Sequence, residues 1–321
     1  MKNLKKVNLF VVGAAKSGTT ALYHFLNLHP EIFLSPIKEP HYFSKDIRFS
    51  NFSDNYRNRN YFDLEKYFAK EVLEFKQIAF IEDSKHYESL FKNSSSEKYL
   101  GEVSNGYLIS KNAYKEIYKY NKNSKIIMIL RNPLERAFSH WRQEFRAGFS
   151  HSDNFYDDIV KDYNLNDWQW GGISNTYVQL GLYSEQIKKY FDLFPKENIK
   201  VFLYDDLINN PKKLRKDLFN FLNISDFEVD FSKRHNSDFE GKNFIINQLF
   251  KFYRKHDYYL KHFTPNSIKI RLKKLLFRNK KAFNTISNEE KNKLIDYFSD
   301  DITKTAKLLN RDLSHWIFSK N

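Results

Sequence analysis

The sequence predicts an α/β protein with a central, mostly parallel sheet flanked by helices and followed by a helical C-terminal part. Apolar runs of strand length alternate with segments of helical periodicity, which is typical of parallel sheets. From residue 245 the pattern is mostly helical to the end. Neither an internal repeat nor a linker divides the chain, so we expect a single domain over residues 1–321. The expected strands are residues 7–12, 32–34, 98–103, 125–130 and 199–204.

A small-residue turn, residues 13–20, joins the first expected strand to a helix over residues 20–28. Backbone N–H groups in such a turn, together with the positive end of the helix dipole, favour a bound anion. Gly13 and Gly18 have the spacing of a P-loop, but Thr19 stands where the P-loop lysine belongs, and Lys16 lies inside the turn instead. The sequence therefore predicts a P-loop-type fold whose phosphate cradle differs from that of nucleotide triphosphatases. The alternative is an ordinary glycine-containing turn.

The second expected strand, residues 32–34, leads into a loop that carries an acid and an imidazole. Two prolines keep residues 35–43 from forming a helix, and the loop contains Glu39 and His41. Because the loop follows a strand, we expect it at the same sheet edge as the cradle. That position suits a general base. Glu39 as a surface acid of the turn, and His41 as a residue that only supports the loop, remain alternatives.

The clearest buried strand, residues 125–130, ends at Arg131, and a helix follows from Leu134. Arg131 and Ser139 bracket about two helical turns, so one ligand lying along the helix start can touch both. The strand ends in arginine and not in a magnesium-binding aspartate, so we expect no metal at this site. An ion pair at the strand end and a plain helix serine are the alternatives.

Composition limits the classes of function and of partner. The chain has 321 residues and no cysteine, which excludes disulfides, zinc–thiolate sites and a cysteine nucleophile. Its formal net charge of +14 favours anionic partners. It has no nucleic-acid-reading motif, so we expect no nucleic-acid partner. Because no apolar run reaches the length of a signal peptide or a membrane span, we expect an unprocessed cytoplasmic protein without a transmembrane segment.

Several separated stretches resemble the sulfotransferases that use 3′-phosphoadenosine 5′-phosphosulfate (PAPS). The closest likeness is to the heparan-sulfate and bacterial carbohydrate branch, in which the general base is the Glu of a Lys-Glu-x-His-Phe/Tyr-Phe loop, matched here by residues 38–43. The resemblance implies PAPS as co-substrate, no metal and a carbohydrate acceptor; it does not fix the oligomeric state. The matching stretches, in the family's order, are residues 13–30, 38–43, 126–139, 181–207 and the ending 309–316.

The resemblance also implies a role for each matching residue. Glu39 would take the proton from the acceptor hydroxyl or amine, and His41 would orient or assist it. Lys16 would also stabilise charge on the leaving phosphate, because a cation near the bridging oxygen favours its departure. The 3′-phosphate would be held by Arg131 and Ser139, with Lys242 in a later basic loop over residues 231–244. The 5′-phosphosulfate would be held by Lys16, Ser17, Gly18, Thr19 and Thr20.

Two features depart from the family pattern or favour other functions. Val103 stands where related enzymes often carry a lysine, so one cationic contact near the acceptor is missing. Residues 201–206 imitate a magnesium-binding strand, which keeps a P-loop kinase as an alternative. Residues 269–281 carry seven basic side chains, and a basic anion-binding module without catalysis is the second alternative. Trp168 and Trp170 either line an acceptor groove or pack internally.

Overall fold

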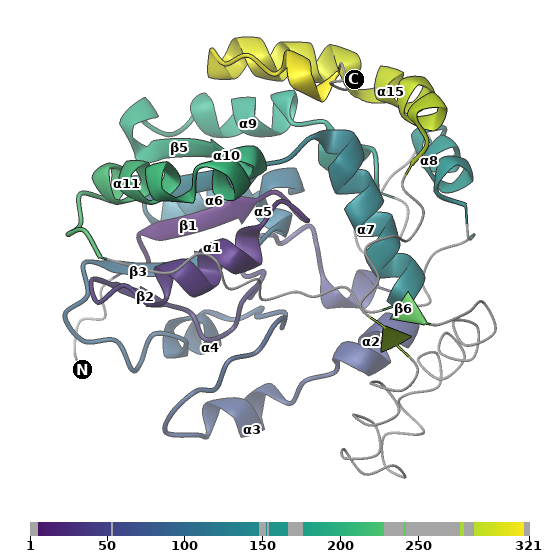
Figure 1. Ribbon diagram of the computed structural model, residues 1–321. Coiled ribbons are helices and arrows are strands. Elements are labelled where there is room, and N and C mark those ends of the chain that lie inside the picture. Colours follow the sequence, from purple (N-terminus) through teal and green to yellow (C-terminus); the bar gives the residue numbers. More distant parts are fainter. Residues whose placement is uncertain are drawn as a thin grey trace.

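The computed structural model describes residues 6–52, 54–147, 152, 154–165, 176–227, 240–241, 277–278 and 286–317. Its main sheet has five strands in the order β2-β3-β1-β4-β5 (Figure 1). Every neighbouring pair of strands in this sheet is parallel, as the sequence predicts. The strands are β1 (Leu9–Gly13), β2 (Ile32–Leu34), β3 (Tyr99–Val103), β4 (Lys125–Leu130) and β5 (Ile199–Leu203).

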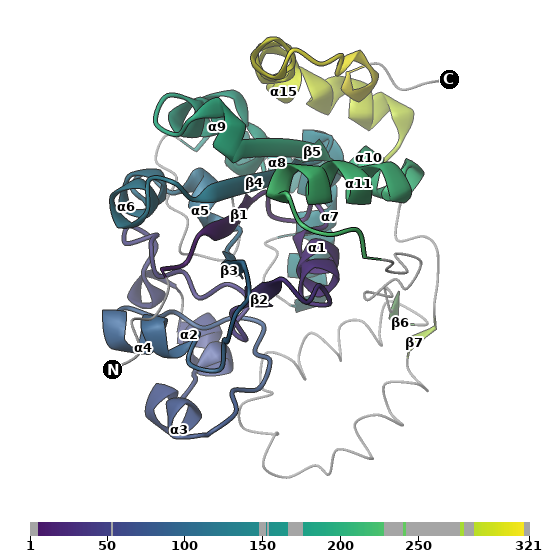
Figure 2. The same cartoon turned by 90° about the vertical axis from the view of Figure 1, so that its left-hand side faces the viewer.

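Helices cover both faces of the sheet, which is why its strands are continuous apolar runs. Leu9 and Val11 of β1 face α1 and α11, whereas Phe10 and Val12 face α5, α6 and α9. Figure 2 shows α1 and α11 on one side of the strands and α6 and α9 on the other. These helices are α1 (Thr19–Leu26), α5 (Gly106–Ile109), α6 (Ala113–Tyr120), α9 (Ser184–Phe191) and α11 (Pro211–Leu222).

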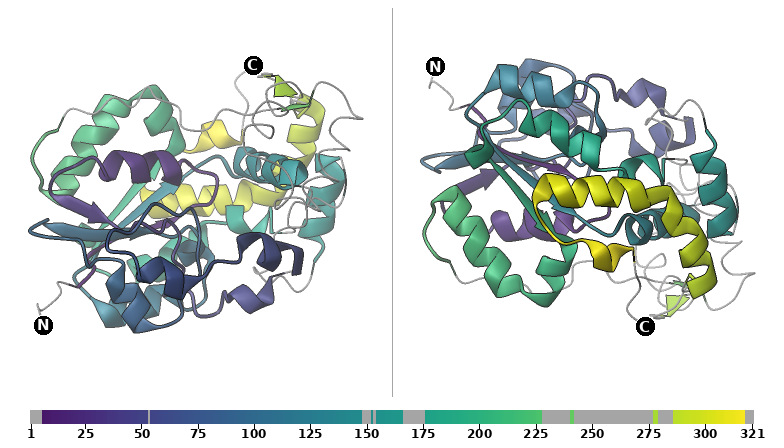
Figure 3. Two further views of the ribbon diagram at one scale, coloured as in Figure 1. Left: turned by 90° about the horizontal axis from the view of Figure 1, so that it is seen from below. Right: turned by 90° about the horizontal axis from the view of Figure 1, so that it is seen from above.

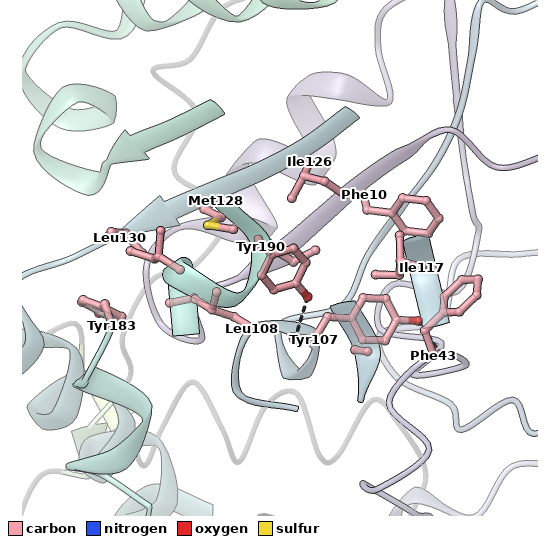
Figure 4. Close-up of a cluster of buried hydrophobic side chains, with 14 of the residues drawn as sticks. Phe10, Phe43, Tyr107, Leu108, Ile117, Ile126, Met128, Leu130, Tyr183 and Tyr190 are labelled. Atoms are coloured by element: carbon pink, nitrogen blue, oxygen red, sulfur yellow. Dashed lines mark hydrogen bonds between the residues drawn. The ribbon is translucent and has the colours of Figure 1, made fainter. Parts of the chain in front are cut away.

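The larger core cluster lies between the sheet and α5, α6 and α9 (Figure 4). Phe10, Ile126 and Met128 point from the strands into this layer and are fully buried. The hydroxyl of Tyr190 on α9 donates to the carbonyl oxygen of Tyr107 on α5 over 2.9 Å, so a buried polar group is satisfied within the layer. The packing fixes α5 and α6, which follow β3, and α9, which precedes β5, against the strands.

The strand order places the site. From β1 the chain crosses to β2 at one edge of the sheet and returns to β3, which lies between β2 and β1; it then forms β4 and β5 on the other side of β1. The order therefore reverses beside β1, and the loops after all five strands meet at one sheet edge. In open α/β sheets such a reversal is where ligands bind.

The helical C-terminal part that we expected is present within the described residues as α15 (Asn288–Leu309). A capping box starts it: the Ser287 hydroxyl accepts from the Glu290 N–H, and the Glu290 carboxylate accepts from the Ser287 N–H. The helix crosses α9, α7 and α8 (Figure 3, right). Of these helices, α7 spans Pro133–Ala147 and α8 spans Phe155–Tyr163.

The sequence pattern and the structure differ over residues 61–75. Their periodicity indicates a helix, but only α3 (Leu64–Phe68) is helical there. The end of this segment pairs with the loop after β2: the Lys76 N–H donates to the Pro36 carbonyl, and the Lys76 carbonyl accepts from the Lys38 N–H. This tertiary pairing overrides the local pattern. The chain also forms η1 (Phe49–Asn51), α2 (Asp54–Asn60) and α10 (Tyr204–Asn209).

Candidate active site

The loop between β1 and α1 has the backbone that its sequence predicts. A side chain at Gly13 would collide with Leu108, since a Cβ there would lie 2.7 Å from the Leu108 Cβ. Gly18 caps α1 with a φ of 96°, a conformation that favours glycine. No acid lies in the first turn of α1. The first N–H groups of a helix lack partners within it, so the loop and helix start present donors to an anion. Ser17 and Thr19 are buried in this loop, and Thr20 is half-buried.

Lys16 lies at the point of the loop where the chain reverses. Its φ is 66°, in the left-handed region. Its Nζ donates to Oε1 of Gln143, on α7, over 2.6 Å. Its carbonyl oxygen lies 3.4 Å from Nη1 of Arg131, which donates to it. The loop that carries Lys16 is therefore tied both to the end of β4 and to α7.

Arg131 and Ser139 lie where the sequence places them, at the end of β4 and on α7, and both are half-buried. The guanidinium of Arg131 stacks over the Tyr204 ring, 4.6 Å from its centroid, and pairs with the Glu135 carboxylate at 3.2 Å. An arginine supported by an aromatic ring suits a phosphate dianion.

Glu39 lies in a loop that the structure holds in an unusual conformation. Glu39 and His41 have φ values of 71° and 56°, in the left-handed region. Non-glycine residues in this region cost of order 1–3 kcal/mol each and cluster at functional sites. Neighbouring strands hold the loop: the Glu39 N–H donates to the Val103 carbonyl over 2.8 Å, and the His41 N–H donates to the Ser104 hydroxyl over 3.3 Å.

The carboxylate of Glu39 is surrounded by donors. Its Oε1 accepts from the Lys38 Nζ at 2.8 Å, from the Asn105 amide at 3.0 Å and from the Gln77 amide at 3.5 Å. Burial alone raises the pKa of this carboxyl, but the buried ammonium of Lys38, together with His41, outweighs burial and lowers the pKa to about 2. Glu39 is therefore ionised at neutral pH and able to accept a proton.

The ion pair with Lys38 predicts a pH effect. Replacing Lys38 with Met removes the cation and leaves the burial, so the pKa of Glu39 should rise. The acid limb of kcat/KM should then move to higher pH, with activity at pH 6 reduced and regained as the pH increases. The wild-type profile should carry no acid limb from Glu39 near neutrality, because its pKa is about 2. Lys45→Met, which breaks an exposed pair with Glu116, is the control. An unchanged profile for Lys38→Met would contradict this assignment.

The same ion pair sets a stability window. The folded pKa of Glu39, about 2, lies below its ordinary value of 4.5. The pair therefore stabilises the fold above pH 4.5, and this stabilisation is lost as the pH falls toward 2.

His41 is buried close to Glu39. Its Nε2 lies 3.6 Å from Oε2 of Glu39, which is too long for a hydrogen bond. The ring stacks on Phe80 with centroids 4.7 Å apart, and Nδ1 lies 3.3 Å from the Ser44 hydroxyl. These contacts fix the ring and with it the loop that carries Glu39.

Val103, which stands where related enzymes often carry a lysine, lies in the core. Its side chain is fully buried in the apolar layer with Leu22 and Tyr23 of α1. The position therefore faces the core. The neighbouring Glu102 points to the opposite layer, where it accepts from the Tyr87 hydroxyl at 2.7 Å. Burial raises the pKa of Glu102 to about 7.

Sequence reasoning missed a polar stripe along α7. Arg136, His140 and Glu144 are spaced four residues apart, so they share one helix face, and all three are buried. Burial raises the pKa of Glu144 well above its usual range and lowers that of His140 well below its own. Burial and the negative charges of Glu39 and Glu144 raise the pKa of Tyr56. The four-residue spacing of Arg136, His140 and Glu144 was the sequence signal that could have identified this stripe. Gln143, next to Glu144 on α7, contacts Lys16.

The acids that imitate a magnesium-binding strand are occupied by the C-terminal segment. Asp206 is paired with the guanidinium of Arg311, and Oδ2 of Asp205 accepts from Nε1 of Trp316 over 3.1 Å. In the described part of the chain, no group of three or more His, Asp or Glu side chains is arranged to hold a metal ion.

Several predicted features lie outside the described residues: Lys242, Trp168, Trp170 and all of the basic stretch 269–281 except residues 277–278. Within the described ranges, no helix has the length and apolar character to cross a membrane.

A parallel sheet with an anion cradle after β1, an arginine after β4 and a carboxylate after β2 defines a P-loop-type group-transfer fold. The chain matches the sulfotransferase domain family model over residues 6–256 and belongs to that family. This confirms the resemblance seen in the sequence. A sulfotransferase from Alicyclobacillus acidocaldarius has a similar structure, with 24% identity, a TM-score of 0.68, and coverage of 97% of this chain and 99% of that one.

The curated relatives are longer than this chain and match it over part of their own length. Mouse carbohydrate sulfotransferase 15 is 25% identical over 253 residues, which cover 68% of this chain and 44% of that protein. Mouse heparan sulfate glucosamine 3-O-sulfotransferase 5 is 23% identical over 218 residues, which cover 67% of this chain and 52% of that protein. The chain thus spans about half the length of the curated relatives it matches.

Proposed function

We propose that this protein transfers a sulfuryl group from PAPS to a hydroxyl or amine of a carbohydrate acceptor. The observation that carries the proposal is the meeting, at one sheet edge, of a lysine-bearing anion cradle, an arginine stacked beside it and a buried carboxylate that stays ionised. Membership of the sulfotransferase domain family supports it. Each of the three groups matches one need of the reaction: a donor site, a 3′-phosphate contact and a base.

The donor's 5′-phosphosulfate would bind to the loop N–H groups and hydroxyls at residues 15–20. Arg131 and Ser139 would bind the 3′-phosphate, which ordinary adenine nucleotides lack. The guanidinium is already bonded to the carbonyl of Lys16, so one rigid unit would contact both phosphates of the donor. This coupling favours a nucleotide phosphorylated at both positions.

In the transfer itself, the acceptor oxygen or nitrogen attacks sulfur while the bond from sulfur to the phosphate oxygen breaks. The electron pair of that bond stays on the phosphate, so negative charge grows on the bridging oxygen. Lys16 would stabilise this charge through its ammonium, which in the resting structure is held by Gln143. Glu39 would accept the proton from the acceptor. A carboxylate with a pKa of about 2 is a weak base. For Glu39 to become an effective base, the bound acceptor must weaken the contacts of the Glu39 carboxylate with Lys38, Asn105 or Gln77.

A carbohydrate acceptor is supported by the names of the curated relatives, a carbohydrate sulfotransferase and a heparan sulfate sulfotransferase. The net charge of +14 suits an acidic glycan. Acceptor sites are built from loops that the fold does not determine. The class of acceptor is therefore tested directly by a transfer assay.

The test is a transfer assay with PAPS, EDTA and a panel of acidic and neutral oligosaccharides, read by mass spectrometry. The expected products are a sulfated oligosaccharide and an equal amount of 3′-phosphoadenosine 5′-phosphate (PAP). Transfer only to phenols, lipids or peptides would overturn the carbohydrate acceptor and keep the donor. Phosphate transfer from ATP with Mg²⁺, without use of PAPS, would overturn the proposal as a whole.

A further inference from the structure

The C-terminal segment makes a set of contacts that the reaction described above does not use. This segment, residues 288–316, lies wholly beyond the family match, which ends at residue 256. Four of its side chains, Asp301, Arg311, His315 and Trp316, bond to the loops around Arg131, and we call them the C-terminal clamp. We propose that the clamp positions Arg131 and thereby sets the selectivity of the donor site for a 3′-phosphate. This inference rests on the proposed function, since it requires that Arg131 binds that phosphate.

The first connection reaches the backbone of Arg131. Asp301, on α15, accepts through Oδ2 from the N–H of Tyr183 over 2.6 Å, and its carboxylate also accepts from the Ser184 hydroxyl at the start of α9. The hydroxyl of Tyr183 in turn donates to the carbonyl of Arg131 over 2.9 Å. Tyr183 is 1% exposed, so this link is rigid and shielded from water.

The second connection reaches the next residue. The carbonyl of Trp316 accepts from the Asn132 amide over 2.9 Å. The same amide group's oxygen accepts from the Leu134 N–H over 3.0 Å, at the first turn of α7. Asn132 thus joins the clamp to the start of the helix that carries Ser139.

The third connection reaches the surface on which the guanidinium lies. Arg311 donates through Nη1 to Oδ2 of Asp206 over 2.9 Å, and its Nη2 contacts Oδ1, giving a two-pronged pair. His315 and Trp316 both contact Oδ2 of Asp205, at 3.2 and 3.1 Å. These acids directly follow Tyr204, whose ring supports the Arg131 guanidinium. A two-pronged arginine–carboxylate pair fixes geometry as well as adding energy.

Three connections from one segment therefore converge on Arg131: on its carbonyl, on its neighbour Asn132 and on the ring beneath its guanidinium. A clamp that served only the stability of the fold would affect all ligands of the donor site alike. A clamp that positions Arg131 should affect only ligands with a 3′-phosphate.

The experiment is calorimetric titration of the full chain with PAP and with AMP, which differ by the 3′-phosphate. For Arg311→Gln, PAP binding should weaken roughly tenfold, the effect of losing one charged hydrogen-bonded pair, while AMP binding stays within about twofold. Trp316→Phe keeps the ring and loses the contact with Asp205, and it provides the same test should Arg311→Gln fail to fold. Lys293→Gln, which breaks an exposed pair on α15, is the matched control and should leave both affinities unchanged. Arg131→Ala should abolish the preference for PAP.

Equal weakening of PAP and AMP, or no change in either, while Arg131→Ala still removes the preference, would overturn the clamp and leave the proposed donor site intact. A wild-type protein that binds PAP and AMP equally, and is unaffected by Arg131→Ala, would overturn the donor site and the clamp together.

Discussion

Lys16→Met should lower kcat by roughly 10²–10³-fold, the effect of removing one preorganised charged donor from a developing oxyanion. The ammonium stabilises charge that grows on the bridging oxygen only as the bond to sulfur breaks. Its loss should therefore affect kcat more than the affinity for PAP. Methionine is unbranched and only one atom shorter than lysine, and like lysine it must adopt the φ of 66° at this position, so the backbone strain is unchanged.

The measurement is single-turnover transfer from PAPS with saturating acceptor, alongside titration with PAP. Lys16→Arg, which keeps the positive charge, is the control and should retain more of the rate than Lys16→Met. A variant that only weakens PAP binding and keeps its single-turnover rate would assign Lys16 to donor binding and contradict its role in the transfer step.

Glu39→Gln should lower kcat by roughly 10²–10⁴-fold, the range of a lost general base. PAP binding should be unchanged, since the carboxylate serves the acceptor and not the donor. The substitution also removes the ionic partner of Lys38, whose side chain is fully buried. An unpaired buried charge destabilises a protein by several kcal/mol, on the order of 3–5, so the melting temperature should fall as well.

A double variant separates the two effects. Lys38→Met combined with Glu39→Gln removes both charges, so it should recover much of the lost stability without recovering activity. The readouts are thermal unfolding and the single-turnover rate. Activity that returns together with stability would mean that Glu39 has only a structural role, and a different base would have to be sought; Glu144, also near Tyr56, would be the first to test.

The fold and the donor side of the site follow from local sequence. The buried strand β4 begins and ends where its apolar run does, and α11 begins at Pro211, a residue that favours the first turn of a helix. These elements are predictable because periodicity, Gly and Pro act over a few residues. Gly13 and Gly18 likewise identify the cradle, since a close approach and a positive φ require glycine there.

The acceptor side was less predictable, for physical reasons. Lys38 and Glu39 are adjacent, and in an extended chain adjacent side chains point to opposite sides. Their contact depends on the positive φ of Glu39, which cannot be predicted from the sequence because the residue is not glycine.

Long-range contacts on the donor side were not predictable either. The contact of Lys16 with Gln143 and that of Arg311 with Asp206 join residues more than a hundred positions apart. No local pattern encodes such pairs.

The most direct test of the account is calorimetric titration of the protein, in EDTA, with PAP beside AMP, ADP and ATP. We predict tight binding of PAP alone, lost in Arg131→Ala, because only PAP carries the 3′-phosphate that Arg131 would bind. Absence of PAP binding, or ATP binding that appears only when Mg²⁺ is added, would contradict the donor assignment and favour the P-loop kinase or the basic anion-binding module instead.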